Sequence, residues 1–222
     1  MKKLMIIGLA SAMFVAGCQT TNPYTGEQQT SKTTWGAGIG ALSGAAIGAL
    51  TNTNSGKQAA RNALIGAGIG ALAGGAVGNY MDQQDAELRQ QLQATGVSVT
   101  RGPNNEIILN MPSDITFDLN SADVKAAFYP VLNSVAKVLK HYEQTIVSVD
   151  GYTDTSGSAD YNMQLSQQRA QSVAGYLQGQ GVQPQRFAVR GWGETNLKVP
   201  TPDNTKNAEN RRVTITLTPL TS

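Results

Sequence analysis

Hydrophobic residues in the second half of the chain recur with two different periods. They occupy every second position in 211–219, which predicts a strand with one buried face. They recur at helical spacing in 125–141 and 161–181, which predicts two helices. Four further stretches favour strands because they are rich in β-branched residues and are bounded by turn residues: 97–111 (with a hairpin at Gly-Pro-Asn-Asn), 115–121, 145–154 and 186–193. Strands that alternate with helices predict an α+β fold, a two-layer α/β sandwich in which helices cover one face of a mixed sheet.

The first half of the chain contains an apolar segment that is repeated. The heptapeptide GAGIGAL occurs at 36–42 and again at 66–72. Glycine recurs every four residues in both copies, at Gly36, Gly40, Gly44 and Gly48 and at Gly66, Gly70, Gly74 and Gly78. On a helix this spacing leaves a groove along which a second backbone can approach closely. We therefore predict a glycine-zipper helical hairpin over 35–81, with a polar loop at 51–62.

This predicted hairpin has two interpretations. Each apolar run of 16 or more residues is short for a bilayer, since 16 residues rise by roughly 24 Å against a hydrocarbon core of about 30 Å. The hairpin either inserts in a membrane, or stays outside it and packs on itself or forms a homo-oligomer. The residues that follow, 82–96, predict a helical spacer that leads to a folded domain at 97–222.

The N-terminus has the pattern of a secretory signal. Two lysines precede an apolar run that ends in Val-Ala-Gly-Cys, and this predicts a signal peptide over 1–17. The end of the run resembles the lipobox of bacterial lipoproteins. That resemblance implies a Cys18 that carries diacylglycerol and an acylated (palmitoylated) amine, followed by a polar tether over 18–34.

Composition argues against nucleic-acid binding, metal binding and catalysis. Loss of Lys2 and Lys3 with the signal leaves 15 basic residues against 15 acidic ones, so no basic surface suggests nucleic acid. His141 is the sole histidine and Cys18 the sole cysteine, and the latter is assigned to lipid. We therefore expect no metal site, no cofactor and no enzymatic activity.

One acidic and one basic residue of the predicted domain are candidates for a salt bridge or for a binding site. Asp154 follows a predicted strand, where α/β folds tend to place binding groups. Arg169 falls on the apolar stripe of the next helix, with Leu165, Val173 and Leu177, so its side chain should face the sheet and require acceptors. The two residues could form a structural salt bridge. Alternatively, Asp154 could bind an ammonium and Arg169 a carboxylate of a zwitterionic ligand.

The order of five motifs, TFD, GYTDTSG, NMQLSQQRAQSVAGYL, GWGE and NRRV, makes residues 110–220 similar to the OmpA C-terminal domain family. The resemblance implies non-covalent binding of peptidoglycan, with the motif positions Asp154 and Arg169 holding the diaminopimelate of a stem peptide. The remaining family positions implied at the site are Phe117, Asp118, Thr153, Asn162, Leu165 and Arg211, although pairing with an acid is an equal alternative for Arg211.

Together these features predict an envelope lipoprotein that tethers a membrane to the cell wall. The alternative is a membrane-embedded helix-packing or assembly factor, for which wall binding is secondary. Gln19 after the lipidated cysteine favours the outer membrane, with the domain in the periplasm. Lys57 and Arg61 in the hairpin loop favour the alternative, the inner membrane with a periplasmic domain.

Overall fold

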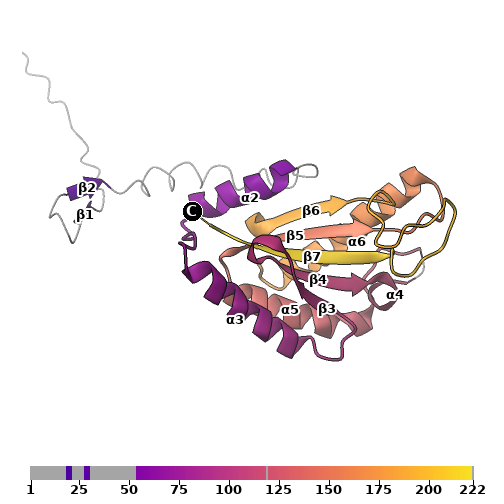
Figure 1. Ribbon diagram of the computed structural model, residues 1–222, viewed down its shortest axis with the longest axis horizontal. Helices are drawn as coiled ribbons and strands as arrows, with labels where there is room; N and C mark the ends of the chain where they lie inside the picture. Colours follow the sequence, from indigo (N-terminus) through magenta and orange to yellow (C-terminus); the bar gives the residue numbers. More distant parts are fainter. Residues whose placement is uncertain (1–18, 22–27, 31–53, 119, 222) are drawn as a thin grey trace, which may run out of the picture.

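A five-stranded mixed sheet forms the centre of the computed structural model, which describes residues 19–21, 28–30, 54–118 and 120–221 (Figure 1). The strand order is β3-β4-β7-β5-β6, with a parallel β5–β6 pair and antiparallel neighbours elsewhere. The strands are β3 Ser98–Arg101, β4 Ile107–Pro112, β5 Thr145–Tyr152, β6 Phe187–Gly191 and β7 Arg212–Pro219, and a separate antiparallel pair joins β1 Gln19–Thr21 to β2 Gln28–Thr30.

The main hydrophobic core lies between this sheet and three helices. These are α3 (Ala76–Gln91), α5 (Tyr129–His141) and α6 (Ala159–Gly179). Alternate residues of β5 and β7 point into this core, as the strand period requires, and so do apolar residues from each helix. The predicted mixed sheet with packed helices is therefore confirmed, and these three helices share one face of it.

Arg186 closes one end of the core. The residue is 1% exposed, and its guanidinium donates to the carbonyl oxygens of Leu139, Tyr142 and Thr145 and to the Thr145 hydroxyl. Burial lowers the pKa of Arg186 to about 10. The side chain thus satisfies carbonyl groups where α5 ends and β5 begins.

The helix α2 (Asn54–Gly66) lies on the opposite face of the sheet. Its buried residues Ala60 and Leu64 form a small second cluster with Ile146 and Leu220. Ile146 alternates with the core residue Val147 along β5, so it points away from the main core. This helix covers much of the segment that was predicted as a polar loop.

The second glycine-rich copy is divided between α2 and α3 rather than forming one helix. Gly68 and Gly74 between them have φ values of +80° and +45°, which interrupt a right-handed helix. The connecting segment is attached to the domain, because Leu72 N donates to Leu220 O and the Gln144 amide donates to Gly70 O. The first copy lies outside the described residues, as do the signal peptide and Cys18.

The strand predicted at 115–121 is wrong. Residues Ser113–Thr116 form the one-turn helix α4, and Phe117 then makes an isolated bridge with Val124. Tertiary bonds fix this turn, since Ser113 N donates to Arg211 O and Lys125 N donates to Thr116 O. None of the described helices is long and apolar enough to cross a membrane.

Candidate functional site

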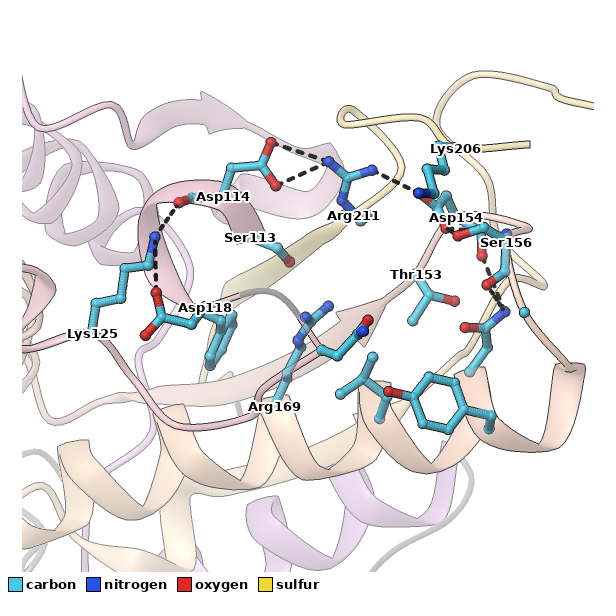
Figure 2. A pocket seen from close by; sticks show the side chains of 16 residues that line it. Ser113, Asp114, Asp118, Lys125, Thr153, Asp154, Ser156, Arg169, Lys206 and Arg211 are labelled. Atoms are coloured by element: carbon cyan, nitrogen blue, oxygen red, sulfur yellow. Dashed lines mark hydrogen bonds and ion pairs between the residues drawn. The ribbon is translucent and has the colours of Figure 1, made fainter. Parts of the chain in front are cut away.

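A cavity of about 530 Å³ opens beside the end of β5 (Figure 2). Its walls come from α4 and the loop after it, from the residues after β5, from the first half of α6 and from the loop before β7. All eight residues predicted at the site line it: Phe117, Asp118, Thr153, Asp154, Asn162, Leu165, Arg169 and Arg211.

Two glycines allow α6 to approach the sheet closely enough to form the floor of this cavity. A Cβ atom at Gly151 would overlap the backbone of Ser166, and one at Gly191 would overlap the backbone of Gln167. Both contacts are with the backbone of α6, so a side-chain movement could not relieve them. The close approach places Arg169, one turn further along α6, at the cavity.

Arg169 is a buried cation that points into the cavity. It is 4% exposed, and its Nε donates to Ser121 O at 2.9 Å. Its guanidinium carbon lies 5.2 Å from the centroid of the Phe117 ring. No carboxylate among the described residues forms an ion pair with it, and burial lowers its pKa. The terminal nitrogens form no hydrogen bond with the described residues, so they can bind an anion that enters from solvent.

Asp154 does not pair with Arg169. One carboxylate oxygen accepts hydrogen bonds from the backbone N–H and the hydroxyl of Ser156. The other accepts from Asn207 N at 3.0 Å and from Arg211 Nη1 at 2.8 Å. Burial raises the pKa of Asp154, but the bonds from Ser156, Arg211 and Asn207 outweigh that effect, and the pKa lies below its ordinary value. The acid is ionised and holds the loop before β7 against the end of β5.

Arg211 connects two walls of the cavity. Its Nη1 reaches Asp154, while its Nη2 donates to both carboxylate oxygens of Asp114 on α4, at 3.0 and 3.2 Å. Burial lowers the pKa of Arg211, but the two acids raise it above its ordinary value. Of the two expectations for this residue, the structure places it in acid pairing, at the rim of the cavity.

The other predicted residues occupy different parts of the cavity. Asn162 is 2% exposed and its amide donates to Glu194 Oε2 and to the carbonyl oxygens of Asp154 and Ser156. Asp118 lies at the rim, 3.6 Å from Lys125 Nζ. Buried apolar surface comes from Phe117 and Leu165, and Thr153 contributes a buried hydroxyl.

Eight residues of the cavity were not predicted. Ser113 and Asp114 lie just before the segment that was wrongly predicted as a strand, and Lys206 lies in a long loop that has no local motif. The full set missed is Ser113, Asp114, Asn120, Lys125, Ser156, Gly157, Tyr161 and Lys206. Acids and bases both surround the cavity, which suits a ligand that carries both charges.

The mixed sheet backed by helices, with a charged cavity at the end of β5, defines an OmpA-like α/β binding domain. Residues 116–211 match the OmpA family, and residues 1–82 match the family described as YMGG-like Gly-zipper. The chain is 51% identical over 212 residues to "Probable lipoprotein YiaD" of Escherichia coli (strain K12), which covers 96% of this chain and 95% of that protein. The chain thus belongs to the OmpA family, as a member that also carries a YMGG-like Gly-zipper.

More distant relatives share the domain alone. "Peptidoglycan-binding protein ArfA" of Mycobacterium tuberculosis (strain ATCC 25618 / H37Rv) is 37% identical over 124 residues, which are 56% of this chain and 35% of that protein. The solved structure of the cell wall anchor of the T6SS from Pseudomonas aeruginosa superposes with a TM-score of 0.54 and 28% identity, covering 61% of this chain and 96% of that one. The family is non-enzymatic, which confirms the expectation of a protein without catalytic activity.

Proposed function

We propose that this protein is a lipoprotein of the outer membrane that tethers that membrane to the cell wall. Its OmpA-like domain, in the periplasm, binds the diaminopimelate of peptidoglycan stem peptides without covalent chemistry. Family membership and the names of the relatives YiaD and ArfA support the general class. The lipobox-like sequence before Cys18 supports the anchor, and Gln19 supports the choice of membrane.

The buried guanidinium of Arg169 is the observation that carries the proposal. A desolvated cation without a carboxylate partner in the described part of the chain is costly unless a ligand supplies one. Its terminal nitrogens can bind a carboxylate bidentately. A free amino-acid end of diaminopimelate carries such a carboxylate next to an ammonium.

Asp154 is the acceptor we assign to the ammonium. Its carboxylate already accepts four hydrogen bonds, of which two come from backbone N–H groups and one from Arg211. The fourth comes from the Ser156 hydroxyl, which is neutral and can rotate away. An ammonium that replaces this hydroxyl exchanges a neutral donor for a charged one while the loop stays in place.

The test measures retention of the full chain, in detergent, on purified murein that contains diaminopimelate. The full chain is required because α3 contributes Met81 and Leu88 to the main core, so a fragment that begins at residue 97 would expose it. We expect Asp154→Ala and Arg169→Ala to abolish retention. Arg169→Lys should retain part of it, because lysine keeps the charge but loses the bidentate geometry.

Arg190→Ala is the matched control. Arg190 is also partly buried, but it stacks on Trp192, 3.6 Å from the ring centroid, and lies outside the cavity. Retention of this variant should equal that of the unmodified protein. Retention that survives in both cavity variants would contradict the assignment of the site.

A further inference from the structure

Two buried hydroxyl groups in the cavity have no hydrogen-bond partner in the described part of the chain. They belong to Ser113 and Thr153, each 3% exposed. Both residues line the cavity. Buried hydroxyls are rarely left unpaired, because the loss of water costs free energy that a new bond must offset. Ser113 also lies before residues 116–211, the part of the chain that matches the OmpA family.

The Ser113 hydroxyl and the Arg169 guanidinium face the same space (Figure 2). Arg169 uses Nε for Ser121 O, so its terminal N–H groups are the donors that remain. The Thr153 hydroxyl lies on the wall formed by the end of β5. Guanidinium N–H groups cannot accept hydrogen bonds, and each hydroxyl can donate one. A hydroxyl can also accept, but both hydroxyls and the guanidinium can donate at the same time to an acceptor that enters this part of the cavity.

We propose that Ser113 forms, with Thr153 and Arg169, a carboxylate subsite that distinguishes a free carboxylate from its carboxamide. This inference rests on the proposed function, and it specifies which stem peptides the cavity accepts. A carboxylate offers acceptor lone pairs on both oxygens and a negative charge. A carboxamide replaces one oxygen by an NH₂ group, which donates where Arg169 also donates, and it leaves that cation unpaired.

The hydroxyl of Ser113 is held in position before any ligand arrives. Ser113 N donates to Arg211 O at 3.0 Å, and the next residue, Asp114, accepts two bonds from Arg211 Nη2. Lys125 Nζ donates to Asp114 O at 2.8 Å. The one-turn helix α4 is therefore fixed at three points, and Arg211 is a positioning residue for the subsite as well as for Asp154.

The experiment measures binding by calorimetry with the full chain in detergent. The probes are diaminopimelate derivatives that are blocked at one amino-acid end and carry either a carboxylate or a carboxamide at the free end. We expect Ser113→Ala to raise the Kd for the carboxylate form by about tenfold, as for loss of a hydrogen bond to a charged group. The Kd for the carboxamide form should change by less than about twofold, so that discrimination falls.

Ser148→Ala is the matched control. The Ser148 hydroxyl is also buried and unpartnered among the described residues, but it lies on the opposite face of β5 from the core residues Val147 and Val149. This variant should bind both probes as the unmodified protein does, and thermal melting should show that both alanine variants are folded.

Four results would overturn the inference. If Ser113→Ala binds both probes normally while Arg169→Ala binds neither, the subsite is wrong and the proposed function stands. If Ser113→Ala weakens binding of both probes equally, or if Ser148→Ala has the same effect as Ser113→Ala, the Ser113 hydroxyl does not distinguish the carboxylate from the carboxamide. If the unmodified protein binds neither probe nor murein, the proposed function fails and the subsite fails with it.

Discussion

Replacement of Arg211 by alanine tests how the cavity is held together. The change removes a charged hydrogen bond to Asp154, whose side chain is 3% exposed, and a bidentate one to Asp114, whose side chain is 58% exposed. The buried bond is worth about 1.5–3 kcal/mol, and the exposed pair contributes at most about 1 kcal/mol. We expect Arg211→Ala to lower the free energy of unfolding by about 2–4 kcal/mol, and the Tm by about 5–15 °C.

The loss of unfolding free energy in Arg211→Ala should depend on pH in a defined direction. The folded-state pKa of Asp154 is lowered, so its contribution to stability is complete above the unfolded-state pKa of about 3.9. That contribution disappears as the pH falls through the lower pKa of the folded protein. The difference in unfolding free energy between the unmodified protein and Arg211→Ala should therefore be constant from about pH 5 to 7 and shrink below about pH 4.

The assay is urea unfolding at a series of pH values, with Arg212→Ala as the control. Arg212 is adjacent in sequence and stacks over Tyr152 at 3.8 Å; among the described residues, its guanidinium donates to the carbonyl oxygens of Asn210 and Asn196 and to no carboxylate. Arg212→Ala should lower the free energy of unfolding, but this decrease should not shrink below about pH 4 as it does for Arg211→Ala. A deficit in Arg211→Ala that persists undiminished at pH 3, or that Arg212→Ala reproduces at every pH, would refute the reasoning.

Two pairs of substitutions away from the charged groups test the packing. Gly151→Ala places a methyl group against the backbone of Ser166 and should cost about 1–3 kcal/mol and weaken murein retention, because α6 carries Arg169. In the same helix α6, a Cβ atom at Gly175 would meet no atom within 4 Å, so Gly175→Ala should instead raise the free energy of unfolding by about 1 kcal/mol. Equal effects of Gly151→Ala and Gly175→Ala on stability would contradict the close contact at Gly151. Gln84 is fully buried and both of its amide atoms lack partners among the described residues, so Gln84→Leu should stabilise by about 1–2 kcal/mol. The exposed neighbour Gln83→Leu should change stability by less than about 0.5 kcal/mol, and a destabilised Gln84→Leu would show that the amide is satisfied in solution.

Local periodicity was sufficient to orient Arg169. The residue shares the helical stripe of Leu165, Val173 and Leu177, and all four are buried. Periodicity could not reveal the partner of Asp154, because Arg211 lies 57 residues further along the chain. The pairing depends on β5 and β7 being neighbours in the sheet, with Tyr152 opposite Arg212, and no single segment encodes that register.

The errors around 115–121 have a similar cause. The β-branched residues Ile115 and Thr116 favour a strand locally, yet contacts from Arg211 and Lys125 hold the segment as a turn. Ser113 therefore had no signal in the sequence as a cavity residue. The second copy of the glycine-rich repeat has the composition of a membrane helix, yet part of it packs against the domain.

The attachment of α2 to the sheet would give the tether that we propose an extensible element. Tension from a lipid on Cys18 would enter the domain at Asn54 and act first on the small cluster of Ala60, Leu64, Ile146 and Leu220. Release of about 22 residues, up to the start of α3, adds roughly 75 Å of extended chain. In the proposed tether, an increase in the distance between membrane and wall would extend this segment before any force reached the cavity.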